Sequence, residues 1–277
     1  MLPPAEHAAL LDQATRVREA ILRMVHTSGS GHVGGALSQA DVLVALYTRF
    51  LRVDPARPDW PDRDRFVLSK GHGGMGLLPV LAERGFLSPA ALDTFGQPGS
   101  PLGMHLDPRK VPGVEVGTGS LGHGLGVAVG MALGARVTRR PSRVVCLLSD
   151  GECYEGSTWE AAISASAFGL ENLCAVVDRN RMTMDGDTET QVPLEPLAQK
   201  WVAFGWRVFG CDGHDFDGIC AAFEGALAPG GGPAVVLADT VKGKGVDFME
   251  GQAAWHYGSL DTEMYARAIA SVRRGAR

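Results

Sequence analysis

The stretch 143-RVVCLLSDGE-152 passes from a short apolar run directly into polar residues and a glycine. A second stretch of the same kind, 173-LCAVVDRNRM-182, follows it along the chain. Apolar, β-branched runs of this length with no polar face are typical of parallel strands that are covered on both sides. Residues 157–170 between them are rich in alanine and predict a crossover helix. The unit is therefore of the β-α-β kind and predicts an α/β fold.

The flanking sequence extends the same pattern. Further strand-like runs occupy residues 66–69, 207–210 and 234–239. Residues 5–27 predict an amphipathic helix, and a second helix is expected to begin at Ser38, with its hydroxyl as the N-cap. No internal repeat or linker divides the chain. We therefore expect residues 1–277 to form a single domain, a parallel sheet covered by helices on both faces.

Composition narrows the class of protein. Apolar residues make up 45% of the 277 residues, charged residues 21%, and the formal net charge is −5, which does not favour a nucleic-acid partner. The five cysteines are odd in number and form no CxxC pair, so a disulfide framework or zinc site is not expected. No leader-like start or membrane-length apolar run is present. These features predict a soluble, cytoplasmic protein without membrane contact.

Two polar residues stand where the first two strands are expected to end. Asp150 follows one strand and Asn180 follows the next, and ligands of open α/β sheets bind at this edge. A carboxylate and an amide oxygen are hard donors that suit Mg²⁺, which completes its shell with phosphate oxygens and water. Gly151 allows close approach of a diphosphate, and a following helix directs its N–H groups there. An Asp-Gly pair after a strand is also a common turn, so the hypothesis depends on Asn180.

At these residues the sequence resembles the thiamine-diphosphate enzymes, whose signature is Gly-Asp-Gly with a later Asn. Ser149 stands in place of the first glycine. The resemblance implies that Mg²⁺ is held by the side chains of Asp150 and Asn180 and by the backbone carbonyl of Met182. It also implies that Gly151, Glu152 and Asn180 contact the bound thiamine diphosphate.

A wider resemblance, to transketolases, extends from about residue 18 to about residue 260. It is carried by short glycine- and histidine-containing segments whose order and spacing are together specific. Val33, Ser120 and His123 replace the Pro, Pro and Gln of the family pattern. The segments are 30-SGHVGG-35, 64-DRFVLSKGHG-73, 103-GMH-105, 117-GTGSLGHG-124, 212-DGHD-215, 242-KGKG-245 and 255-WH-256.

The resemblance assigns roles to individual residues. His32, His72, His105 and His256 are expected to be the catalytic histidines, because imidazole can relay hydroxyl protons near neutral pH. Each could instead be a structural or surface histidine, but loop placement favours function. The remaining assignments are cofactor contacts by Gly119, Ser120, Leu121 and His72, charge screening by Lys242 and Lys244, and acids between two active sites at Glu155 and Glu160.

The implied activity is transfer of a two-carbon ketol unit from a ketose, or its phosphate, to an aldose. In transketolases a Glu on a second, pyrimidine-binding domain activates the cofactor, and we expect this chain to carry neither that domain nor the C-terminal domain. We therefore expect a separate partner chain, in an α₂β₂ assembly. Three alternatives stay open: a 1-deoxyxylulose-phosphate-synthase-like subunit, the α chain of a 2-oxo-acid dehydrogenase, and a non-catalytic cofactor-binding subunit.

Overall fold

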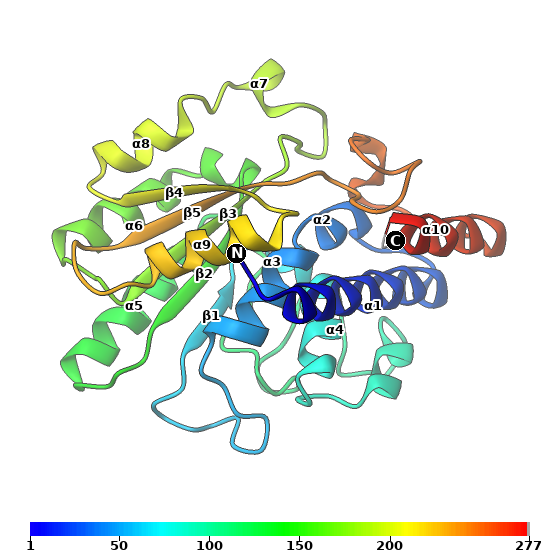
Figure 1. Ribbon diagram of the computed structural model, residues 1–277, viewed down its shortest axis with the longest axis horizontal. Helices are drawn as coiled ribbons and strands as arrows, with labels where there is room; N and C mark the ends of the chain where they lie inside the picture. The colour runs from blue at the N-terminus through cyan, green and yellow to red at the C-terminus, as the bar shows by residue number, and fades with distance from the viewer. Residues whose placement is uncertain (276–277) are drawn as a thin grey trace.

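The computed structural model describes residues 1–275, and its centre is a five-stranded parallel sheet with the order β1-β2-β3-β5-β4 (Figure 1). Every neighbouring pair of strands is parallel. The predicted fold class is thereby confirmed. The strands are β1 (Arg65–Leu68), β2 (Val144–Ser149), β3 (Leu173–Arg179), β4 (Arg207–Asp212) and β5 (Ala234–Asp239).

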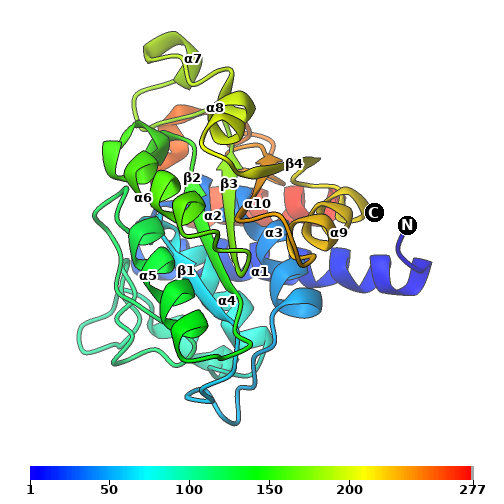
Figure 2. The same cartoon turned by 90° about the vertical axis from the view of Figure 1, so that its left-hand side faces the viewer.

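Helices cover both faces of this sheet (Figures 1 and 2). Successive residues of β3 alternate between two hydrophobic cores, with Cys174 and Val176 in one and Ala175 and Val177 in the other. The strands are therefore apolar throughout because each face is buried. The first core includes α1 (Pro4–Ser28), α2 (Val33–Ser38), α3 (Ala40–Ala45), α4 (Gly74–Glu83), α9 (Phe216–Ala226) and α10 (Thr262–Gly275); the second includes α5 (Gly124–Val137), α6 (Gly156–Ala167) and α8 (Leu197–Ala203).

The long N-terminal helix α1 forms where the apolar periodicity predicts it. Leu10, Val17 and Ile21 lie on its buried face, each at most 1% exposed. The helix ends at Gly29, whose φ of 80° is the left-handed conformation that closes many helices. Its apolar stripe packs against α3, α4 and α10, which fixes the segment that follows α1 beside the sheet.

The expected helix start at Ser38 is wrong. The glycine-containing segment after His32 is itself helical, and Ser38 is the last residue of α2, with a short separate α3 following it. The Ser38 hydroxyl is fully buried and donates a hydrogen bond to Asp178 at 2.6 Å. The hydroxyl makes a tertiary contact with the sheet, and local capping is not its function.

The carboxyl ends of the strands meet at one edge of the sheet. In the register, Ser149 of β2 is paired with Asp178 of β3, and Asp178 with Ala238 of β5. Short one-turn segments gather at this edge: η2 (Gly71–Gly73), η4 (Gly151–Tyr154) and η5 (Ala253–His256); the other short elements are η1 (Leu46–Phe50), η3 (Pro89–Thr94) and α7 (Thr188–Gln191). Among the described residues, no helix combines the length and apolar character that crossing a membrane requires.

Candidate active site

A cavity of about 400 Å³ opens at the carboxyl edge of the sheet. That volume lies in the usual range for small-molecule sites. The loops after β1, β2, β3 and β5 all contribute to its walls. The lining residues are His32, Gly35, Lys70, His72, His105, Gly119, Leu121, Ser149, Gly151, Asn180, Met182, Thr183, Met184, Asp185, Lys242 and His256.

Asp150 lies just behind this cavity and is fully buried. One carboxylate oxygen accepts a hydrogen bond from Gly151 N at 2.8 Å, and the other accepts from Arg181 N at 2.6 Å and from the Arg179 guanidinium at 3.2 Å. A carboxylate offers about four acceptor positions, so these contacts leave room for one more donor or a cation. Burial, and then the charge of Asp178, raise the pKa of Asp150, and a bound cation would offset both effects.

Asn180 is held by contacts at both ends of its side-chain amide. Its nitrogen donates to Asp178 at 3.2 Å, and its oxygen accepts from Met182 N at 3.1 Å. Asp178 in turn forms a buried ion pair with Lys70 at 2.5 Å. Burial opposes the Asp178 charge, but Lys70 outweighs it and lowers the pKa of that carboxyl. The anionic Asp178 therefore fixes which end of the Asn180 amide presents its oxygen.

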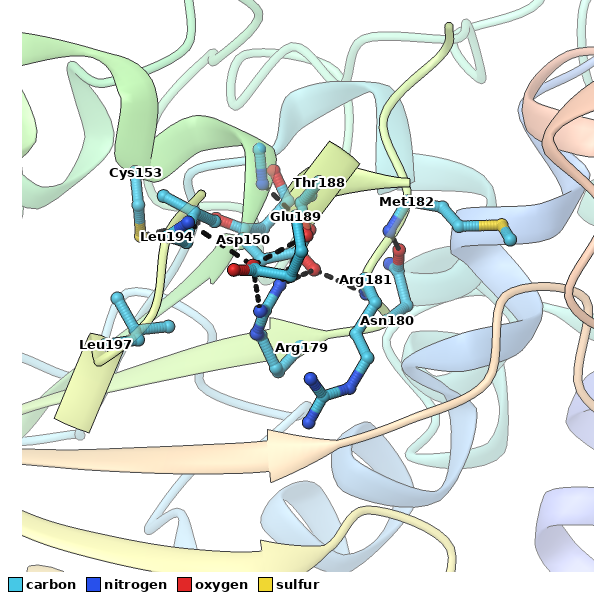
Figure 3. A network of polar contacts seen from close by, with 12 residues as sticks. Asp150, Cys153, Arg179, Asn180, Arg181, Met182, Thr188, Glu189, Leu194 and Leu197 are labelled. Carbon is cyan, nitrogen blue, oxygen red and sulfur yellow. Dashed lines mark hydrogen bonds and ion pairs between the residues drawn. The ribbon is translucent and has the colours of Figure 1, made fainter. Parts of the chain in front are cut away.

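A buried arginine, Arg179, connects Asp150 to the segment 188–195 (Figure 3). Arg179, only 3% exposed, donates to Asp150, to Thr188 at 2.8 Å, to Glu189 at 2.6 Å and to Glu195 at 3.1 Å. Burial opposes its charge, but the bonds to Glu189 and Glu195 raise the pKa of Arg179. The guanidinium therefore stays charged and anchors the α7 segment beside the cavity.

Three imidazoles meet inside the cavity. The ring centroids of His32 and His72 are 5.1 Å apart, those of His32 and His256 5.3 Å, and those of His72 and His256 5.6 Å. His105 lines the same cavity but is exposed, on the opposite loop beside Gly119. The four expected catalytic histidines, distant in sequence, thus share one site.

These three clustered rings are neutral at physiological pH. Burial, and then Lys70, lower the pKa of His72 to about 2, while burial, and then Lys242, lower the pKa of His256 to about 4. Burial, followed by the charge of His105, lowers the pKa of His32. A neutral imidazole carries one donor and one acceptor, so each ring can both give and receive a proton.

Lys242 is one of two lysines that line the cavity, with Lys70, and is only 2% exposed. Its ammonium donates to the carbonyls of Met182 at 3.2 Å and Thr183 at 2.9 Å, and lies 2.9 Å from His256 Nδ1. Burial lowers the pKa of Lys242 to about 8. Because an ammonium can only donate, His256 Nδ1 must accept, which leaves the ring proton of His256 on Nε2.

Some expected residues do not line the cavity. Within residues 1–275, the expected metal and cofactor contacts outside its lining are Asp150, which lies behind the wall, Ser120, which is exposed, and Glu152. Glu152 is fully buried and accepts hydrogen bonds from Ser69, from Gly122 N at 2.8 Å and from Ser149 N at 3.2 Å. It ties the loop that carries Gly119 and Leu121 to the end of β2, a supporting role that the motif alone did not indicate.

Other residues have functions that the sequence did not assign. Lys70 and Asp178 stand inside the motifs quoted above, but only the three-dimensional structure shows that they form an ion pair. Arg179 directly precedes Asn180, but nothing in the sequence indicated its contact with Asp150. Lys244 lies outside this cavity, near Glu250 at 3.7 Å. Glu155 and Glu160 are exposed at the start of α6.

The parallel sheet with a cavity at its carboxyl edge defines an open α/β domain of the ligand-binding kind. The family described as "Transketolase, thiamine diphosphate binding domain" matches residues 11–273. The chain belongs to the transketolase family. The predicted family is thereby confirmed.

This chain is similar to transketolase subunits along nearly their whole length and to part of a longer, solved transketolase. The 6-deoxy-6-sulfo-D-fructose transketolase subunit SqwG of Clostridium sp. (strain MSTE9) is 45% identical, over 96% of each chain. An apulose-4-phosphate transketolase subunit of Phocaeicola vulgatus is 41% identical, over 94% of this chain and 92% of that one. A solved transketolase from Campylobacter jejuni is 31% identical, with a TM-score of 0.90, and covers 95% of this chain but only 42% of its own.

Proposed function

We propose that this chain is the diphosphate-binding subunit of a two-component transketolase that uses thiamine diphosphate and Mg²⁺. One observation carries the proposal: Asn180 and Met182 line the same cavity as a cluster of neutral histidines, and the Asp150 carboxylate lies directly behind its wall. A metal-and-diphosphate end and a proton-transfer end are what a cofactor-dependent sugar transferase requires.

The proposed metal ligands form an all-oxygen set: a carboxylate from Asp150, the amide oxygen of Asn180 and the backbone carbonyl of Met182. Such a set suits Mg²⁺, which would take further oxygens from the diphosphate and water. Gly151 has open space beside it, since an added Cβ there would meet only Thr183 at 3.5 Å. The backbone at Gly151 can therefore lie against a diphosphate, and the Lys242 ammonium would screen the added negative charge.

The bound cofactor would supply the nucleophilic carbon that cleaves and forms the bond next to the sugar carbonyl. The protein would bind the sugar and move protons at its hydroxyl groups. His256 presents Nε2–H, because its Nδ1 accepts from Lys242. His32 and His72, both neutral, would orient and relay the hydroxyl proton of the donor sugar. His105, on the facing loop, would bind near the donor carbonyl.

A second polypeptide would complete the site. The two relatives that match along nearly their whole length are both called subunits, whereas the single-chain Campylobacter enzyme is more than twice as long as the matched region. The remaining length of such an enzyme would be supplied by a partner that carries the activating Glu and the sugar-phosphate contacts. We propose an α₂β₂ assembly of the two chains.

In this proposal the donor is a ketose or ketose phosphate, and the acceptor is an aldose or aldose phosphate. The assay combines the chain, thiamine diphosphate and Mg²⁺ with xylulose 5-phosphate and ribose 5-phosphate. Parallel reactions use the two sugars in the names of the relatives as donors, with the companion subunits of those relatives and candidate partners encoded with this chain. Ketol transfer only in the presence of a second chain is expected. Activity of the chain alone, or none with any partner, contradicts the proposal.

A further inference from the structure

A buried network of polar side chains extends from the N-terminal helix toward the cavity. Arg18 of α1 forms a two-pronged ion pair with Asp41 of α3, with N–O distances of 2.8 Å and 2.5 Å. The same carboxylate lies 2.7 Å from His214 Nδ1, in the loop after β4. The side chains of all three residues are at most 11% exposed. His214 also borders a separate cleft of about 760 Å³, so this polar network lies outside the site described above.

The network defines the protonation of the His214 ring. Burial opposes the charge of Asp41, but Arg18 and His214 outweigh it and lower its pKa to about 2, so the carboxylate can only accept. His214 Nδ1 must therefore carry the proton. The other nitrogen, Nε2, accepts a hydrogen bond from the backbone N–H of Val241 at 2.9 Å. Both nitrogens of the neutral ring are thus used, one toward Asp41 and one toward Val241.

Val241 directly precedes Lys242, whose side chain lines the cavity. On the other side of Lys242, Gly243 N donates to Gly34 O at 3.0 Å, and its φ of 80° suits glycine. A Cβ at Gly243 would lie 2.5 Å from Met249 O, so this turn has no room for a side chain. The peptide on each side of Lys242 is therefore held, and His214 makes the contact on the N-terminal side.

We propose that His214 is a positioning residue: it fixes the Val241 peptide and so directs the Lys242 ammonium at the diphosphate end of the cavity. The inference rests on the proposed function, because it assumes that Lys242 meets the cofactor. The inference assigns a role to the 212-DGHD-215 motif. His214 of this motif affects the cavity through its hydrogen bond to the backbone of Val241, next to Lys242.

Two substitutions separate positioning from simple structural support. In His214→Asn the side-chain amide can still donate to Asp41 from about the position of Nδ1, but no acceptor reaches Val241. In His214→Gln an oxygen can occupy about the position of Nε2 and accept from Val241, while the contact with Asp41 is lost. A structural role is rescued by Asn, and a positioning role is rescued by Gln. His7→Asn, on α1, is the matched control.

The readouts are amide hydrogen exchange at Val241 in the isolated chain and the thiamine diphosphate concentration giving half-maximal rate in the reconstituted enzyme. For His214→Asn we expect faster exchange at Val241 and a half-saturation raised roughly fivefold, equivalent to one lost hydrogen bond of about 1 kcal/mol, with kcat nearly unchanged. His214→Gln should restore both. Wild-type values in His214→Asn, or equal defects in the two variants, would overturn the proposal.

A wild-type measurement decides the matter if neither variant folds. The ¹⁵N shifts of His214 should show a protonated Nδ1 and an unprotonated Nε2; a protonated Nε2 would overturn the proposal. These two spectroscopic tests need no partner chain. An inactive reconstituted enzyme would therefore count against the proposed function while exchange at Val241 still tests the His214 contact.

Discussion

Asp150 accepts a hydrogen bond from the backbone N–H of Arg181 at 2.6 Å, across the loops that follow β2 and β3. The contact brings the carboxylate beside Asn180 and Met182, although thirty residues separate Asp150 from Asn180 in sequence. Parallel neighbouring strands make this possible, since both loops leave the sheet at the same edge. The proposed metal site is therefore a product of the strand register.

Replacing Asp150 by Asn keeps the shape of the side chain and removes its charge. We expect the affinity for Mg²⁺ with thiamine diphosphate to fall by roughly 100-fold or more, since loss of an outer-shell partner alone costs 10- to 100-fold. Isothermal titration of the reconstituted enzyme measures the change. Asp247→Asn, an exposed residue paired with Arg274, is the control and should bind normally. Unchanged affinity in Asp150→Asn would remove this residue from the metal site.

His256→Asn tests the assigned tautomer. The Asn oxygen can still accept from Lys242 where Nδ1 did, but the Nε2–H group is lost. We expect kcat/KM for the donor ketose to fall by about 10²- to 10³-fold, as is usual for loss of a proton-transfer group. The half-saturating concentration of cofactor should change by less than about threefold, because the hydrogen bond to Lys242 is kept. A threefold change corresponds to less free energy than one hydrogen bond contributes. A variant that loses cofactor affinity and keeps kcat would assign His256 to cofactor binding.

The buried histidines make stability depend on pH. His72 has a pKa of about 2 in the folded protein and 6.5 as the ordinary value, so below pH 6.5 the unfolded chain takes up a proton that the folded chain excludes. The free energy of unfolding should therefore be greatest above pH 6.5 and decrease as the pH falls toward 4. Urea denaturation at several pH values measures it.

His72→Gln carries no titrating group and should show a shallower decline than the wild type. His72→Asn, which likewise carries no titrating group, should follow the His72→Gln curve. Parallel curves for His72→Gln and the wild type would show that His72 titrates normally in the folded chain.

Gly71 marks a point where two site loops touch. A Cβ added there would lie 2.5 Å from the backbone of Thr118, so Gly71→Ala must displace one loop. We expect the free energy of unfolding to drop by about 1–3 kcal/mol. Gly130→Ala on α5 has open space around its Cβ and should stabilise by up to about 1 kcal/mol. Chemical denaturation compares the two, and a neutral Gly71→Ala would show that the loops are not in close contact.

Much of the fold could be predicted from the sequence because apolar runs report burial directly. The strands around Cys146 and Val176 are apolar on both faces, a pattern typical of a parallel sheet that is covered on both sides. Ser38 shows the limit of local reasoning. Its position before an apolar run is typical of an N-cap, but its hydroxyl bonds to Asp178, which is 140 residues away. Tertiary contacts of this kind leave no local signal.

The candidate site divides in the same way. Lining residues such as His72 and Gly119 stand in glycine-rich loops, where motif order identifies them. Residues that act behind the wall, such as Arg179 and Glu152, depend on which loops meet in space. Glu152 follows the Asp-Gly pair and is expected to contact the cofactor; its side chain also accepts hydrogen bonds from Ser69 and Gly122, which the motif does not indicate. A motif locates a site more reliably than it assigns the role of each residue in it.

The proposed function requires that the edge of the sheet between β2 and β3 bind a divalent cation together with the diphosphate. Crystals grown with Mn²⁺ and thiamine diphosphate would reveal this site, because Mn²⁺ replaces Mg²⁺ and scatters anomalously. We expect one anomalous peak bounded by Asp150, Asn180 and the Met182 carbonyl. A peak elsewhere, such as at His7, Asp215 and Asp217, whose ligand atoms lie within 4.8 Å of one another, with none at Asp150, would contradict it.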